Sequence, residues 1–294
     1  MKFSIVDVFA ETKYTGNQLA VIWGEGVERL SDQEMLKIAQ EMNYSETTFI
    51  CNSEQQNGGY PVRIFTPKRE LPFAGHPTLG TAYIIAEEII KDSVNQVILN
   101  LAVGQIPVTW KTTESGKQIL WMRQNPPELT HIYDWQLLAP VLNLEPSDFD
   151  INYPIQEVST GIPFIIVPLK TQSALKQAKV NIERYSEFIQ ATIVKEIFIF
   201  CPETHNPNNH LCARMFAPAL GITEDPATGS ANGCLAGYLS NYNYFGSDVV
   251  NIRVEQGYEI DRPSLLLLKA EKTEDLIQVQ VGGNVIKVAE GILF

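Results

Sequence analysis

The sequence predicts an α+β chain of two duplicated domains, each mostly β-strand with one central helix. Three observations lead to this prediction: short strand-like runs along most of the chain, motifs that recur about 150 positions apart, and two apolar helices at corresponding places. The chain has 294 residues, which suits two domains of about 150 residues each.

The first half is typical of strands combined with two helices. Ser31 and Glu34 have the spacing of a capping box, so a short amphipathic helix is expected to start there and to end at Asn43. An apolar helix is expected from the Gly75-His76-Pro77 turn to about Ile90. Alternating apolar residues predict strands at 2–9, 19–23, 45–51, 62–66, 97–101, 106–111 and 118–123.

Asn125-Pro126-Pro127 marks the expected crossing between domains, because proline lacks a backbone donor and restricts the residue before it. We expect an N-terminal domain at 1–124, joined by the last strand at about 284–294, and a C-terminal domain at 125–283. Helices of the second half are expected at 134–142, 182–191 and from the Asp225 turn to about 240, and strands at 155–159, 164–168, 196–201, 213–217, 249–255, 264–270, 276–281 and 284–290.

Several anchors in the same order indicate the duplication. The matched positions are Thr15-Gly16 with Thr160-Gly161, Glu46 and Cys51 with Glu196 and Cys201, Arg63-Ile64-Phe65-Thr66-Pro67 with Arg214-Met215-Phe216-Ala217-Pro218, and His76-Pro77 with Asp225-Pro226. The helix that follows each of the last two motifs has little polar surface, so it should be buried on all sides. A sheet curled around each helix would satisfy this.

Composition excludes several classes of protein. The net charge is −12 and Lys and Arg do not cluster, which argues against a nucleic-acid partner. No apolar run approaches about 18 residues, so no membrane span is expected, and no signal peptide is apparent at the N-terminus. Glycine-rich nucleotide motifs and His-Glu-x-x-His zinc motifs are absent from the sequence.

The four cysteines are Cys51, Cys201, Cys212 and Cys234. They form no CxxC pair and none has metal-ligand spacing with a histidine, so we expect buried free thiols in a reducing cytoplasm and no metal. His131, His205 and His210 lie in polar or loop contexts and are expected on the surface.

The two turns that open the central helices are the candidate site. Backbone N–H groups at a helix N-terminus bind anions, and two such ends facing each other could hold one carboxylate from both sides. The alternative is that Thr78, Thr228 and Ser230 only cap their helices. For either turn alone the residue pattern favours capping, but the duplication shifts the balance towards a shared site.

Three side chains near these turns could carry chemistry. His76 could be a general acid/base or a hydrogen-bond donor, or a structural histidine. Asp225 could act in the site or simply stabilise the helix N-terminus. Glu46, at the entry to an apolar strand, either lies in solvent or points into a cleft, where burial would raise its pKa.

Taken together, these motifs resemble the phenazine-biosynthesis isomerase (PhzF-like) family. The resemblance covers nearly the whole chain and rests on Gly16-Asn17-Gln18, Ser45-Glu46-Thr47, Phe73-Ala74-Gly75-His76-Pro77-Thr78, Ser159-Thr160-Gly161 and Glu224-Asp225-Pro226-Ala227-Thr228-Gly229-Ser230-Ala231.

The resemblance implies a diaminopimelate-epimerase-like fold, in which two similar domains, each a β-barrel around a helix, enclose an active site in the cleft between them. It also implies a homodimer without a cofactor. By the same resemblance Glu46 is the acid/base, and His76, Asp225 and Ser230 complete the catalytic set. The helix N-termini, at Gly75, Thr78, Thr228 and Gly229, would hold the carboxylate of the substrate.

The expected function is therefore a cofactor-independent isomerase that moves a proton between carbons of a small carboxylate. The alternative is a carboxylate-binding or scaffold dimer of the same fold without chemistry. Racemases of this fold use two cysteines at the helix ends, and His76 and Asp225 stand there instead, which disfavours that chemistry. One departure from the family pattern is Asp261, which a turn with positive φ could still accept.

Overall fold

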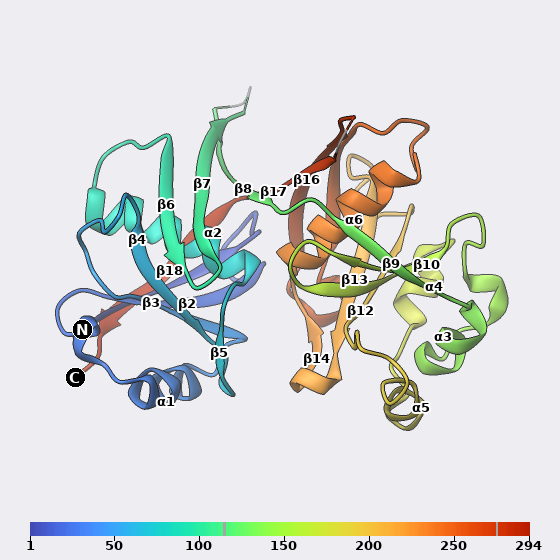
Figure 1. The fold of residues 1–294 in the computed structure, drawn as a ribbon, viewed down its shortest axis with the longest axis horizontal. Helices are drawn as coiled ribbons and strands as arrows, with labels where there is room; N and C mark the ends of the chain where they lie inside the picture. Colours follow the sequence, from blue (N-terminus) through green and yellow to red (C-terminus); the bar gives the residue numbers. More distant parts are fainter. Residues whose placement is uncertain (114–115, 275) are drawn as a thin grey trace. The chain divides into compact units, whose positions relative to one another are not determined.

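The computed structural model describes residues 1–113, 116–274 and 276–294. It has a mixed α/β fold with extensive β-sheet and few helices (Figure 1). The chain divides into two compact units, Met1–Arg123 with Gly282–Phe294, and Gln124–Val281. Among the described residues, none of the helices has the length and apolar character needed to cross a membrane.

The first unit places the last strand of the chain beside the first. β18 pairs with β1 and β1 with β2, both antiparallel. β2 and β3 are parallel, β3 and β4 antiparallel, β4 and β6 parallel, and β6, β7 and β8 antiparallel in turn. The short β5 pairs with β4. The strands are β18 (Val285–Ile292), β1 (Lys2–Val8), β2 (Asn17–Trp23), β3 (Glu46–Ile50), β4 (Tyr60–Phe65), β5 (Glu70–Leu71), β6 (Gln96–Leu101), β7 (Gly104–Thr112) and β8 (Gln118–Gln124).

Helix α2 (Gly75–Ile84) is the buried element of this unit. It packs against β1, β2, β3, β6, β7 and β18, which confirms the prediction of a helix buried on all sides. Gly80 allows the close approach, since a Cβ there would lie 2.6 Å from Leu19 Cδ2. The predicted continuous helix to Ile90 is wrong in one respect: Ile85–Ile90 form a π-helix, whose wider turn buries Ile85 and Ala86 and leaves Glu87 exposed.

The second unit shows the same series of parallel and antiparallel pairings. β9, β10 and β11 are antiparallel in turn, β11 and β12 parallel, β12 and β13 antiparallel, β13 and β15 parallel, and β15 and β16 antiparallel. β14 pairs with β13, and β17 follows β16 in the sheet. The strands are β9 (Glu128–Tyr133), β10 (Ile155–Ser159), β11 (Pro163–Pro168), β12 (Ile197–Cys201), β13 (Leu211–Ala217), β14 (Ile222–Asp225), β15 (Val250–Gln256), β16 (Ser264–Lys272) and β17 (Ile277–Gly283).

Helix α6 (Gly229–Asn241) is buried over nearly its whole length and packs against β10, β11, β15 and β16. Its glycines permit close contacts: a Cβ at Gly233 would overlap Oε1 of Gln124, and one at Gly237 would lie 2.5 Å from Pro127. The predicted close packing of this glycine-bearing helix is confirmed.

The remaining helices lie outside the sheets' buried centres formed around α2 and α6, and three of them contribute residues to a further hydrophobic cluster of the second unit. The capping box of α1 (Asp32–Met42) is confirmed, with Ser31 and Glu34 bonded reciprocally and Asn43 ending the helix at a φ of 53°. α3 (Trp135–Leu142) starts after Asp134 as predicted, and α5 (Ile182–Phe188) ends earlier than predicted. Strand β9 and helix α4 (Gln172–Gln177) were not predicted, because β9 buries little but Tyr133 and α4 is too short to show a period. The part of the chain that the structure describes also has four short 3₁₀ segments: Val27–Arg29, Pro146–Asp148, Pro218–Leu220 and Tyr258–Ile260.

Candidate active site

Glu46 and His76 meet in the first unit. Glu46 is the first residue of β3 and His76 the second residue of α2. Glu46 Oε2 lies 3.4 Å from His76 Nε2, and the two side chains are 12% and 6% exposed. The interpretation of Glu46 as a solvated residue is therefore wrong, since its carboxylate is mostly buried beside an imidazole.

The imidazole of His76 is neutral near neutral pH. Burial lowers the pKa of His76 to about 3, and a backbone hydrogen bond with Gln18 opposes this shift only in part. The contact with Glu46 is consequently not an ion pair, and 3.4 Å is longer than a well-formed hydrogen bond. Nδ1, the other ring nitrogen of His76, lies 3.3 Å from Asn17 Nδ2. A neutral imidazole has one nitrogen that donates and one that accepts a hydrogen bond, so His76 can orient the Glu46 carboxylate or a substrate by hydrogen bonding.

The side chain of Thr78 does not cap the first turn of α2. The N-cap position is Ala74, which makes no side-chain capping hydrogen bond. Thr78 Oγ1 instead donates a hydrogen bond to Ala74 O at 2.7 Å. The capping alternative for Thr78 is therefore wrong, and Gly75 and His76 present their backbone at the helix N-terminus, where anions bind.

The matching turn of the second unit is organised around Asp225 and Thr228. Asp225 ends β14, Thr228 is the N-cap of α6, and Gly229 and Ser230 are the first two helical residues. Thr228 Oγ1 donates to Asp225 Oδ2 at 2.5 Å, and the side chain of Thr228 makes no capping hydrogen bond to α6. All four residues are buried. The capping alternative fails for Thr228 and Ser230 too, because the Thr228 hydroxyl serves Asp225 and Ser230 lies inside the helix.

The structure thus brings the predicted residues together in two sets. Glu46, Gly75, His76 and Thr78 lie in the first unit, and Asp225, Thr228, Gly229 and Ser230 in the second. The sequence did not predict two buried amides beside them, Asn17 and Gln256. Asn17 belongs to the Gly16-Asn17-Gln18 motif but was given no role in the site, and nothing in the sequence around Gln256 distinguishes it from other strand residues.

A second cluster of ligand-type side chains consists of His205, Cys212 and Glu255. The Glu255 carboxylate is fully buried and accepts hydrogen bonds from His205 N, His205 Nδ1, Asn206 N and Asn209 Nδ2 at 2.7–2.9 Å. Burial would raise the pKa of Glu255, but these bonds outweigh it and lower the pKa. Burial also raises the pKa of the Cys212 thiol. The cluster suits a loop anchor better than a metal site, because its carboxylate oxygens are already used and its thiol is held protonated.

The cysteine prediction is confirmed in part: all four are free, three are buried and Cys51 is partly buried. The spacing rule missed the approach of Cys212 Sγ to His205 Nδ1, at 3.8 Å. Seven positions separate these residues in the sequence, and the loop that follows β12 brings them together. His205 itself is stacked on Tyr258, with ring centroids 3.9 Å apart.

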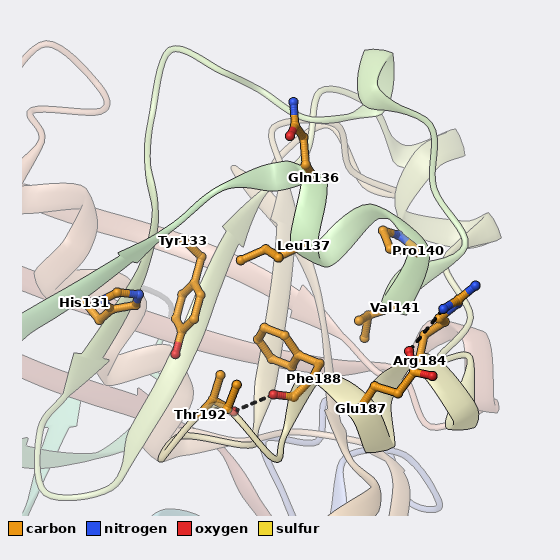
Figure 2. A pocket seen from close by; sticks show the side chains of 11 residues that line it. His131, Tyr133, Gln136, Leu137, Pro140, Val141, Arg184, Glu187, Phe188 and Thr192 are labelled. Atoms are coloured by element: carbon orange, nitrogen blue, oxygen red, sulfur yellow. Dashed lines mark hydrogen bonds and ion pairs between the residues drawn. The ribbon is translucent and has the colours of Figure 1, made fainter.

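A pocket of about 420 Å³ lies in the second unit between β9, α3 and α5 (Figure 2). Its walls combine rings such as Tyr133 and Phe188 with aliphatic side chains such as Leu137. Several of its polar groups are paired within the chain: Arg184 with Glu187, Tyr133 with Glu157, and Thr192 with Phe188 O. The pocket contains none of the predicted site residues, so it does not extend the candidate site.

Curated relatives of this chain are named as isomerases. The trans-2,3-dihydro-3-hydroxyanthranilate isomerase of Pseudomonas aeruginosa is 34% identical over 294 residues, covering 99% of this chain and 98% of that protein. An uncharacterized isomerase of Clostridium acetobutylicum is 32% identical and covers 96% of this chain and 94% of its own. The chain is thus an enzyme of the isomerase class.

The family follows from a match along nearly the whole chain. A model of the phenazine biosynthesis-like proteins matches residues 6–291. The crystal structure of a PhzF-family phenazine biosynthesis protein from Bacillus anthracis superposes with a TM-score of 0.91 at 27% identity, covering 100% of this chain and 99% of that one. The chain belongs to the phenazine biosynthesis-like family, as its motifs predicted.

Proposed function

We propose that the protein is a cofactor-independent isomerase in which Glu46 moves a proton between two carbons of a small carboxylate. The observation that carries the proposal is the contact between the mostly buried Glu46 carboxylate and the neutral imidazole of His76 at the start of α2. A carboxylate in such surroundings is suited to remove and return a proton.

The proposed reaction balances without a further reactant. Glu46 removes a proton from one carbon, the electron pair of that C–H bond forms a new double bond to the adjacent carbon, and the electron pair of the existing double bond moves to its far carbon. The substrate then takes the proton back at another carbon. His76 stays a neutral imidazole throughout and orients the substrate or Glu46 by a hydrogen bond.

The second turn supplies the remaining part of the proposed site. Asp225, Thr228, Gly229 and Ser230 lie at the N-terminus of a buried helix, a place that favours anions through backbone donors and the helix dipole. In this proposal the turns of α2 and α6 face each other across a cleft between the units, and together they hold the substrate carboxylate.

We also propose that the two units arose by duplication of one domain. The shared series of strand pairings around α2 and α6 supports two copies of one domain, each a barrel-like sheet around its helix. We further propose a homodimer, which light scattering after gel filtration would test.

Deuterium exchange tests the reaction class. The first substrate to try is trans-2,3-dihydro-3-hydroxyanthranilate, the compound in the name of the Pseudomonas relative. In D₂O the wild-type protein should convert it with deuterium at carbon, and Glu46→Gln should not. A protein that binds this or other small cyclic carboxylates, raising the melting temperature, but never exchanges a carbon-bound proton would overturn the proposal in favour of a binding function.

A further inference from the structure

Gln256 is a fully buried residue at the end of β15, and it contacts the turn before α6 through both amide atoms. Its Nε2 donates to Asp225 O at 2.9 Å and to Thr228 Oγ1 at 3.1 Å. Its Oε1 accepts from Thr228 N at 3.1 Å and from Asn232 Nδ2 at 2.9 Å. One side chain therefore ties together the strand, the N-cap and the first turn of the helix.

The chemistry of these partners fixes the direction of the hydrogen bonds. Thr228 N–H can only donate and Asp225 C=O can only accept, so the amide of Gln256 has one orientation. Because Nε2 donates to the Thr228 hydroxyl, the single proton of that hydroxyl points to Asp225 Oδ2, 2.5 Å away. The relay runs from Gln256 through Thr228 to Asp225 and presents a donor to the carboxylate.

The backbone beneath Gln256 is rigidly held. Gln256 pairs with Ala213 of β13 on one side and with Ser264 of β16 on the other. Successive residues of a strand face opposite sides of the sheet, and the neighbouring Glu255 is anchored by four hydrogen bonds from the 205–209 loop. The start of the relay is consequently fixed from both faces of the strand.

We propose that Gln256 is a positioning residue of the substrate site, which fixes the Thr228 hydroxyl as a donor and thereby keeps Asp225 an ionised acceptor. The proposal rests on the proposed function in one respect, namely that Asp225 belongs to the substrate site. Gln256 itself touches no reacting atom and acts only through Thr228 and the backbone of Asp225.

Gln256→Glu reverses the relay at nearly constant shape. The introduced carboxylate accepts but does not donate, so the Thr228 proton turns toward it and Asp225 loses that donor and gains a nearby negative charge. Both changes favour the protonated form, so the pKa of Asp225 should rise by about one unit or more. The other ionisable groups near the turn include Arg214 on β13, Glu224 on β14, Arg253 and Glu255 on β15, and Tyr258, Glu259, Asp261 and Arg262 after it, and they are the same in every variant.

The measurement is a ¹³C NMR titration of the Asp225 carboxyl, assigned with Asp225→Asn. The matched control is Gln156→Glu, another buried glutamine of the second unit, which bonds Thr130 O and Tyr242 Oη and not this turn. This control should leave the Asp225 titration at the wild-type value, whatever it does to stability.

Thr228→Val and Thr228→Ser repeat the test if Gln256→Glu does not fold. The valine variant removes the hydroxyl and should raise the pKa of Asp225, whereas the serine variant keeps the hydroxyl and should restore the wild-type titration. An unchanged Asp225 titration in Gln256→Glu or, failing that variant, in Thr228→Val would overturn the proposal. Because the titration needs no substrate, a shifted Asp225 together with absent deuterium exchange in wild type would reject the proposed function and leave the relay standing.

Discussion

The carboxylate of Glu46 lies 3.4 Å from Nε2 of His76, yet the two do not form a salt bridge, because burial keeps the imidazole neutral. The contact joins the first residue of β3 to the second residue of α2, 30 positions apart. An acid/base group beside a neutral imidazole can exchange protons without first breaking an ion pair.

Acid should destabilise the protein through His76. The unfolded state binds a proton on this residue below about pH 6.5, and the folded state does so only below about pH 3. Between these values the free energy of unfolding should fall with falling pH, by up to about 1.4 kcal/mol per pH unit from this group alone. Urea unfolding at several pH values should show a shallower dependence for His76→Gln. Equal slopes for the two proteins would mean that the imidazole is charged in the folded state.

Replacing Glu46 by Gln should lower the rate of deuterium exchange by about 10²-fold or more, because the amide cannot take up the proton. The melting temperature should stay near that of the wild type, since the side chains have the same shape. Glu196→Gln is the matched control: Glu196 occupies the corresponding place before β12 and is also partly buried. Similar losses in both variants would point to a general effect of charge removal and not to catalysis by Glu46.

The arginines at corresponding places in the two units should differ in their contribution to stability. Arg214 binds Glu224 at 2.9 and 2.7 Å, and both side chains are almost fully buried. Arg63 binds Glu70 in the same two-pronged manner, but both side chains are partly exposed. Arg214→Met should lower the free energy of unfolding by about 3–5 kcal/mol because it leaves a buried carboxylate unpaired.

Arg63→Met should cost about 1 kcal/mol or less, since water can solvate Glu70. Urea denaturation of both variants measures the difference. Equal costs would show that the exposure of these pairs does not govern their energies.

Gly233→Ala should destabilise the protein by about 1–3 kcal/mol. The new Cβ would occupy the position of Gln124 Oε1, which accepts from Thr160, while Gln124 Nε2 donates to Gly229 O. The control is a double-mutant cycle with Gln124→Ala. Once Gln124 is truncated, Gly233→Ala should cost nothing further and should gain some helix propensity. Additive losses would place the clash elsewhere.

Local rules predicted the parts of the structure that depend on neighbouring residues. The capping box of Ser31 and Glu34, the end of α1 at Asn43 and the positive φ tolerated at Asp261, observed at 57°, all follow from backbone sterics and short-range hydrogen bonds. The lack of polar residues in α2 and α6 likewise predicted their burial. These signals are present within a few residues of sequence.

The site itself could be predicted only as a set of residue types. Thr228 looked like a helix cap, but its hydroxyl is held by Gln256, which lies 28 positions later on a different strand. Whether Glu46 is buried could not be predicted for the same reason, because its neighbour His76 lies on α2, 30 positions later in the sequence. Such contacts depend on which strands pair and how the helix crosses them, and periodicity does not encode this.

The pairing of β1 with β18 has a consequence for how the chain is made. Every strand of the second unit lies between residues 128 and 283, whereas the first unit needs residues 285–292 beside residues 2–8. At about 5–20 residues per second, β1 waits roughly 15–60 s for its outer partner to leave the ribosome. Until then one side of β1 is an open strand edge, and such edges promote association between chains. The half of the protein that is synthesised first is therefore the half that finishes folding last.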